Sequence, residues 1–175
     1  MNKIYNILLV GSGGREHCIA KTLLRTANIS RERNDIKEIN IYCFGTHMNP
    51  GLKAICKKFV IGKDLKVLDG YLSENGKLSG IKFDFAVIGP EAYIADGYTE
   101  FLEAIGISVI APDKKYGLIE TSKIFARNFV YDIDKGQYLP KYRFFIGGCG
   151  LDEIDKAVKY AYEDLSGEFV VKDDG

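Results

Sequence analysis

Short apolar runs alternate with segments of helical period over residues 1–110 of the chain. Each apolar run has the length of a β-strand, whereas some segments between them repeat apolar residues every three to four positions, as helices do. This alternation predicts parallel α/β architecture. The predicted strands are residues 4–10, 39–44, 58–61, 83–88 and 107–110.

Two of the intervening segments have a clear apolar helical face, and we expect both helices to pack on the sheet. The first face consists of Ile19, Ala20, Leu23, Leu24 and Ala27. The second consists of Tyr98, Phe101, Leu102 and Ile105. Leu65, Leu68 and Leu72 indicate a further helix, the polar residues 29–37 predict a loop, and residues 73–80 predict an exposed turn.

The pattern changes after Pro112. Ser122 is placed to cap a helix, and the polar residues 132–139 are expected to connect that helix to the next element. The apolar face of this helix consists of Phe125, Ala126, Phe129 and Val130.

A β–α–β unit is predicted for the rest of the chain, with a strand at 142–146, a helix from Asp152 and a strand at 168–172. The whole chain is therefore expected to hold one domain at residues 1–111 and the beginning of a second domain at residues 112–175.

Charge and composition exclude several classes of protein. Lysine plus arginine and aspartate plus glutamate both number 24, so no general electrostatic field favours nucleic acid or an anionic membrane. No apolar run approaches the roughly 20 residues of a spanning helix, and none resembles a signal peptide, so a cytoplasmic location is expected. The four cysteines have no CxxC spacing and are predicted to be reduced, mostly buried thiols: Cys18, Cys43, Cys56 and Cys149.

A glycine-rich loop, Gly11-Ser12-Gly13-Gly14-Arg15-Glu16-His17, connects the first predicted strand to the first helix. Backbone N–H groups at a helix start, next to glycines without side chains, favour an anion, so the loop predicts a phosphate site. A tight turn without a ligand is the alternative interpretation. Arg15 could add charge-assisted hydrogen bonds or remain solvated, and His17 is more typical of a packing group than of a catalytic base.

The loop does not match a dinucleotide-binding fingerprint. The third glycine of G-x-G-x-x-G is replaced by Glu16, and no acidic residue follows the second strand to bind a ribose 2′-hydroxyl. A nicotinamide-dependent oxidoreductase is therefore disfavoured, and a single phosphate suits the loop better than a pyrophosphate.

Two more polar residues, Asn49 and Glu91, lie just beyond the ends of parallel strands, at the edge where open α/β sheets bind ligands. We expect both to face the glycine loop. Glu91 could offer its carboxylate to an amine or to ribose hydroxyls, or it could cap the helix that follows.

Five segments, in order along the chain, resemble those of the phosphoribosylamine–glycine ligase (glycinamide ribonucleotide synthetase) family. They are GSGGREH at 11–17, Asn49-Pro50-Gly51, Gly89-Pro90-Glu91-Ala92, ETSKIFA at 120–126 and VVKDDG at 170–175. The chain departs from the family pattern at Thr46-His47-Met48, where PGNPG would begin, and at Tyr93-Ile94, where GPEAPL has proline and leucine. Threonine and aspartate also replace the usual glycine of EGSKAFA and alanine of VVKADG.

The resemblance implies a Rossmann-like, pre-ATP-grasp domain followed by the start of an ATP-grasp domain. It implies an ATP-dependent reaction that joins glycine to 5-phosphoribosylamine through a glycyl phosphate. The substrate-binding residues it implies are Gly11, Ser12, Gly13, Gly14, Arg15, Glu16, Asn49, Pro50, Gly51, Gly89, Pro90 and Glu91.

By the same resemblance, Lys123 and Lys172 correspond to early ATP-binding lysines, with Lys172 at the end of a buried strand. The Mg²⁺ ligands are expected beyond residue 175, so the chain by itself is expected to be an inactive N-terminal portion. Another ATP-grasp ligase and a non-catalytic sugar-phosphate-binding module remain the alternatives.

Overall fold

The computed structural model describes residues 3–32, 36–148 and 150–174. Contacts between residues divide the chain into two compact units, Met1–Gly117 and Leu118–Gly175.

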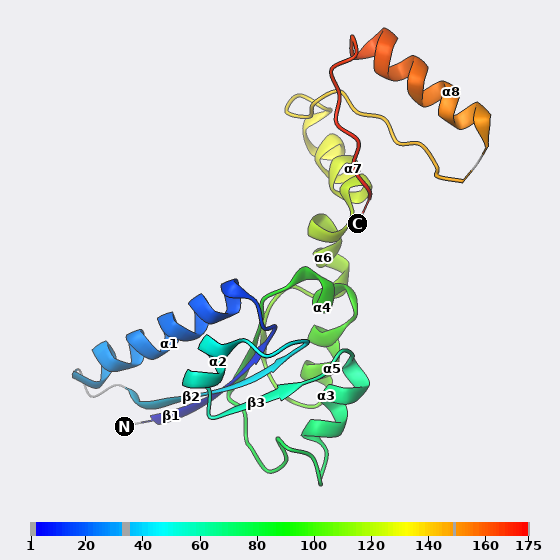
Figure 1. The fold of residues 1–175 in the computed structure, drawn as a ribbon. Coiled ribbons are helices and arrows are strands. Elements are labelled where there is room, and N and C mark those ends of the chain that lie inside the picture. Colours follow the sequence, from blue (N-terminus) through cyan, green and yellow to red (C-terminus); the bar gives the residue numbers. More distant parts are fainter. Residues whose placement is uncertain (1–2, 33–35, 149, 175) are drawn as a thin grey trace. The chain divides into compact units, whose positions relative to one another are not determined.

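Five parallel strands form the centre of the first unit, in the order β3-β2-β1-β4-β5 (Figure 1). β1 (Lys3–Val10) pairs with β2 (Ile36–Gly45) and with β4 (Phe85–Ile88), while β3 (Lys58–Ile61) and β5 (Val109–Ile110) lie at the two edges. The predicted parallel α/β class is confirmed. The connections run outward from β1 to β3 and then return to β4, so the order reverses between β1 and β4, which is where open sheets form a ligand crevice.

Helices cover both faces of this sheet because the central strand alternates two apolar faces (Figure 1). Leu9 packs in a cluster with residues of α1 (Gly14–Glu32) and α2 (Pro50–Ile55). Leu8 and Val10 belong to the opposite cluster, which includes residues of α3 (Leu65–Leu72), α4 (Glu91–Ala95) and α5 (Tyr98–Ala104). The two helical faces predicted from the sequence, in α1 and α5, therefore do pack on the sheet, except for Ile105, which follows the end of α5 and is exposed.

The predicted loop at 29–37 is wrong over most of its length. Helix α1 continues to Glu32 and strand β2 begins at Ile36, while residues 33–35 lie outside the described part of the chain. Each added helical residue gains a backbone hydrogen bond once the helix has formed, so a polar, aperiodic sequence can extend a helix that apolar residues have anchored.

Helices are the regular elements found among the described residues of the second unit. Helix α6 (Lys114–Thr121) crosses the division between the units, and α7 (Lys123–Asp134) and α8 (Leu151–Lys159) follow, the latter running into a π-helical turn, η1 (Tyr160–Asp164). The predicted cap is confirmed, because the Ser122 hydroxyl accepts a hydrogen bond of 3.0 Å from the Phe125 N–H. The helix predicted from Asp152 is also confirmed and starts one residue earlier.

The two strands predicted in this unit are wrong. Residues 142–146 and 168–172 have no strand assignment, and most of their apolar side chains are exposed, to 74% for Ile146 and 82% for Val171. An apolar, β-branched segment becomes a strand only when a neighbouring strand takes its backbone hydrogen bonds. The predicted connection at 132–139 begins later than expected, because α7 continues to Asp134 and ends at Lys135, whose φ is 57°.

The cysteines differ partly from expectation. Cys43 is buried and Cys56 is half-buried, but Cys18 is exposed, and Cys149 lies outside the described residues. Among the helices that the structure describes, none has the length and apolar character needed to cross a membrane.

Candidate functional site

The glycine loop between β1 and α1 is built around the carboxylate of Glu16. This side chain is only 2% exposed, and its Oε2 accepts a hydrogen bond of 2.6 Å from the Gly13 N–H. A side chain at Gly11, Gly13 or Gly89 would collide with it. Glu16 therefore occupies the space that a third glycine would leave open, and the Gly13 N–H already has an anionic partner.

Asn49 joins this loop to α2 through both ends of its amide. Its Oδ1 accepts hydrogen bonds from the N–H groups of Gly51 and Leu52, at 3.0 and 3.2 Å, and so caps α2. Its Nδ2 donates to the carbonyls of Ser12 and Gly13, at 3.1 and 3.3 Å. Asn49 thus lies against the loop as predicted, but it holds the backbone of the loop in place.

His17, in the first turn of α1, packs against the start of α2. A side chain at Gly51 would collide with the imidazole ring, so the glycine is needed for this close approach. Pro50 is the first residue of α2, where its missing N–H costs no hydrogen bond. These contacts favour packing over catalysis for His17.

Arg15 connects the glycine loop to the segment after β4. Its Nη1 donates a hydrogen bond of 2.6 Å to the Gly89 carbonyl and lies 3.9 Å from Oε2 of Glu91. Glu91 is the first residue of α4, but Pro90 holds the cap position and α4 has no side-chain cap. Both charged side chains are substantially exposed, so the ion pair itself contributes little stability and its groups stay accessible.

A pocket of about 360 Å³ lies beside this loop, at the carboxyl edge of the sheet. The predicted residues Ser12, Gly13, Glu16 and Pro90 line it. It is also lined by residues that the sequence did not single out: Thr46, His47, Lys63, Ala92, Tyr93 and Asp96. Most of these polar residues follow the carboxyl ends of β2, β3 and β4. In a parallel sheet these ends meet at one edge, so the strand order is the feature from which these residues could be predicted.

A chain of polar contacts runs along one wall of the pocket. The Nδ1 atom of His47 lies 3.2 Å from the hydroxyl oxygens of both Ser12 and Thr46. Tyr93 is hydrogen-bonded to Thr46, and its pKa lies above the ordinary value because burial disfavours the phenolate. The structure therefore fixes the positions of several donors on one side of the pocket.

Beneath the loop, two thiols lie in contact. The Sγ of Cys43 donates to the Gly11 carbonyl at 3.2 Å. Cys43 is also hydrogen-bonded to Cys56, and this interaction holds the pKa of Cys43 above its usual range and that of Cys56 below it. Cys43 is thus a further support of the loop backbone.

The two predicted ATP-binding lysines belong to the second unit and lie on neighbouring segments. The Asp174 carboxylate accepts hydrogen bonds from the Ser122 hydroxyl, at 3.0 Å, and from the Ile124 N–H, at 2.7 Å, while its carbonyl accepts one from the Lys123 N–H, at 3.0 Å. The segment that ends in Asp174 therefore runs past the start of α7, and Lys172 lies two residues before Asp174. Lys172 is exposed, so the expectation of a buried strand end is wrong.

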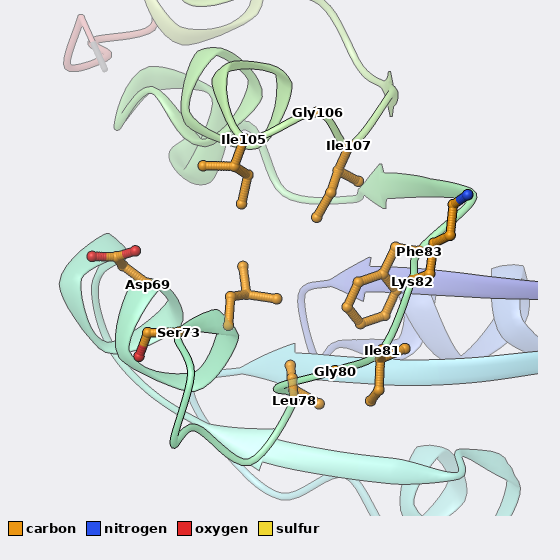
Figure 2. Close-up of a pocket in the computed structure, with 11 residues that line it drawn as sticks. Asp69, Ser73, Leu78, Gly80, Ile81, Lys82, Phe83, Ile105, Gly106 and Ile107 are labelled. Carbon is orange, nitrogen blue, oxygen red and sulfur yellow. The ribbon is translucent and has the colours of Figure 1, made fainter.

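A second pocket, of about 410 Å³, is lined by none of the residues that line the pocket beside the glycine loop (Figure 2). Apolar side chains such as Leu78, Phe83 and Ile107 form much of its wall, with Asp69 and Lys82 among the polar residues. Within the described residues no group of three or more histidines, cysteines, aspartates or glutamates is arranged to hold a metal ion.

Comparisons with known proteins agree on one family. Residues 5–120 match the family described as "Phosphoribosylglycinamide synthetase, N domain". A phosphoribosylamine–glycine ligase of Methanococcoides burtonii is 35% identical over 151 residues, covering 85% of this chain and 31% of that protein. One of Methanosarcina acetivorans is 32% identical over 171 residues, covering 97% of this chain and 33% of that protein. The chain thus spans about a third of the length of these relatives.

Solved structures show the same fold at low identity. The N5-carboxyaminoimidazole synthetase of Staphylococcus aureus complexed with ADP has a TM-score of 0.53 and 13% identity, over 91% of this chain and 37% of that one. The N5-carboxyaminoimidazole ribonucleotide synthetase of Thermotoga maritima has a TM-score of 0.53 and 11% identity, over 97% and 44% respectively.

Proposed function

The chain belongs to the phosphoribosylglycinamide synthetase family through its N domain, and we propose from this that the protein is an ATP-dependent ligase of purine biosynthesis. Its substrates would be glycine and 5-phosphoribosylamine, and its product glycinamide ribonucleotide. The observation that carries this proposal is the family match over residues 5–120, which includes every residue lining the pocket beside the glycine loop.

Residues 1–111 would form the sugar-phosphate-binding domain, and residues 112–175 would begin an ATP-grasp domain. The pocket beside the loop suits a small polar ligand, since it combines the carboxylates of Glu16 and Asp96 with the ammonium of Lys63 and several hydroxyls. Carboxylates accept hydrogen bonds from ribose hydroxyls or from an amine, and an ammonium group binds phosphate. Glu91, exposed near the loop, would contribute a further acceptor.

ATP, when bound, would supply the phosphoryl group that activates the carboxylate of glycine, a poor electrophile in its free form. Lys123 and Lys172 would hold the phosphates, because both ammonium groups belong to segments joined at the start of α7. Charge neutralisation and positioning account for most of the catalysis in phosphoryl transfer, and magnesium usually shares that work. In the second half-reaction the amine of phosphoribosylamine would displace phosphate and form the amide bond. A cytoplasmic location fits these substrates.

Ligand binding by the 175-residue chain tests the sugar-phosphate assignment. We expect isothermal calorimetry to detect ribose 5-phosphate and glycinamide ribonucleotide, and to detect no binding of NADH. Gly13→Val is expected to abolish binding, because its side chain displaces the Glu16 carboxylate from the loop.

Two results would contradict the proposal. Tighter binding of aminoimidazole ribonucleotide than of glycinamide ribonucleotide would point to another ligase of the same fold. Binding of NADH in place of sugar phosphates would return the loop to the dinucleotide-binding class.

A further inference from the structure

We propose that the phosphate of the sugar-phosphate ligand is held by the side chains of Lys63 and His47, which line the pocket beside the glycine loop, and that the loop holds the sugar. This inference rests on the proposed function, because it assigns the parts of its ligand to different groups lining one pocket.

The glycine loop already uses much of its hydrogen-bonding capacity within the protein. The Gly13 N–H is bound by Glu16, and the Gly11 N–H donates to the Phe44 carbonyl at 2.8 Å. Asn49 donates to the carbonyls of Ser12 and Gly13. A phosphate placed against the loop would also meet the buried carboxylate of Glu16, and two anions in a site of low dielectric repel each other strongly. The loop is thus a poor phosphate cradle and a better partner for hydroxyl groups.

His47 lines the pocket, and its imidazole ring lies next to two hydroxyl groups. The Ser12 hydroxyl accepts a bond of 3.4 Å from the His47 N–H, which leaves its own hydrogen available for Nδ1 of the same residue, 3.2 Å away. A ring that accepts at Nδ1 carries its proton at Nε2 when neutral. Thr46, on the other side of Nδ1, is held in turn by Tyr93. The imidazole ring is therefore held at Nδ1 by two hydroxyl groups, and in the tautomer that accepts at Nδ1 its Nε2 carries an N–H donor.

Lys63 supplies an ammonium group among the residues that line the pocket. It lies between two anchored residues: the Gly62 N–H donates to the Gly45 carbonyl at 3.0 Å, and Asp64 caps α3 by accepting from the Val67 N–H at 3.0 Å. Lys63 has no ion-pair partner within the part of the chain that the structure describes, and its side chain lines the same pocket as His47. A fixed attachment point and an unpaired ammonium group are what a phosphate-binding lysine requires.

The two carboxylates in the pocket complete the assignment. Glu16 and Asp96 would repel a phosphate but accept hydrogen bonds from ribose hydroxyls or from the amine. The residues that position His47, namely Thr46 and Tyr93, stand where the chain departs from the family segments after β2 and β4. Thr46 and Tyr93, 47 positions apart in the sequence, are hydrogen-bonded to each other and therefore meet in one wall of the pocket.

Calorimetry with the 175-residue chain tests this inference, with ribose 5-phosphate and ribose as the two ligands. We expect Lys63→Gln to weaken ribose 5-phosphate binding by about 10- to 100-fold and His47→Phe by about 10-fold, the cost of a lost charged or neutral hydrogen bond. Binding of ribose is expected to change less than threefold. Lys82→Gln, in the pocket of Figure 2, is the matched control and is expected to bind as wild type. Lys63→Met, with a different side chain, checks that the loss follows the charge.

The outcomes separate the inference from the proposed function. If wild type binds ribose 5-phosphate and both Lys63→Gln and His47→Phe bind it equally well, these two residues do not hold the phosphate, and a loss of binding in Arg15→Gln would then place the phosphate at the loop. The inference is then overturned, while the proposed function stands. If wild type distinguishes neither ligand from buffer, both are overturned. Unchanged amide spectra of the variants show that any loss is local.

Discussion

Replacement of Asn49 tests whether the glycine loop is held by a side chain of a neighbouring helix. In Asn49→Ala, α2 loses its cap, which costs about 1 kcal/mol. The carbonyls of Ser12 and Gly13 lose a donor each, at about 1 kcal/mol net for each hydrogen bond. We therefore expect the free energy of unfolding of the first unit to fall by about 3 kcal/mol. For a unit of this size this lowers the melting temperature by roughly 10 °C.

Two further variants separate the cap from the tie to the loop. Asn49→Ser keeps an oxygen for the cap but removes the side-chain amide N–H groups that reach the loop. Its free energy of unfolding is therefore expected to fall by about 2 kcal/mol. Asn49→Asp also keeps the cap, and its added charge favours the start of α2, but it places a carboxylate oxygen against two carbonyls. If the tie to the loop is important, aspartate is less stable than serine.

Urea denaturation followed by circular dichroism measures these differences, since the chain has no tryptophan to report by fluorescence. Ser122→Ala, which removes the cap of α7 in the other unit, is the control for general loss of helix caps. The reasoning is refuted if Asn49→Asp equals or exceeds Asn49→Ser in stability, or if serine is as stable as wild type. In addition, the affinity for ribose 5-phosphate is expected to be lower in the variants that lose the hydrogen bonds from residue 49 to the Ser12 and Gly13 carbonyls.

Two other changes test the surroundings of the loop. Gly89→Ala places a methyl group on the Glu16 carboxylate and is expected to lower the free energy of unfolding, measured by urea denaturation, by about 1–3 kcal/mol. Gly14→Ala, with open space around the new atom, is expected to leave it unchanged. Equal effects of the two substitutions would contradict the packing argument. Because the neighbouring Cys43 thiol lowers the pKa of Cys56, the Cys56 thiolate forms at lower pH than in a free cysteine. Iodoacetamide is therefore expected to label Cys56 before Cys43 as pH rises from 6, and mass spectrometry showing the reverse order would refute this.

The strands of the first unit could be predicted because each is an apolar run that ends at a turn residue. β1 stops at Gly11 and β4 stops at Gly89, and both were placed to within a few residues from the pattern alone. The helical face around Ala20 was also predicted, because a helix on a buried sheet must repeat its apolar residues at the helical period.

The second unit shows the limit of the same reasoning. Residues 142–146 and 168–172 have the composition of strands, but a strand depends on a partner that its own sequence does not specify. The prediction of a loop at the end of α1 is wrong for a different reason. Its last turn has no apolar requirement, so its composition resembles that of a loop although the backbone continues to Glu32.

The pocket shows a third limit, since its polar lining carries no local motif. Lys63 is one lysine among many in the sequence, and His47 stands in a segment that departs from the family pattern. Only the order of the strands brings them to one side of the same pocket, next to Ser12. The sequence motifs therefore identify the glycine loop but not most of the other residues that line the pocket.

The buried Glu16 side chain gives a structural reason for glycines near the loop. Glycines at 11, 13 and 89 come from two loops, and each would collide with the same carboxylate if it carried a side chain. Their spacing is typical of a loop that admits a phosphate, yet in this fold the buried Glu16 side chain leaves room only for glycine at 13 and 89, and at 11 it acts together with Pro90 and a φ of 120°. Arg15 also binds the Gly89 carbonyl and so joins the loops after β1 and β4. Under the proposed assignment the phosphate is selected by side chains next to these loops, so a substitution there is expected to alter phosphate binding without disturbing the loop.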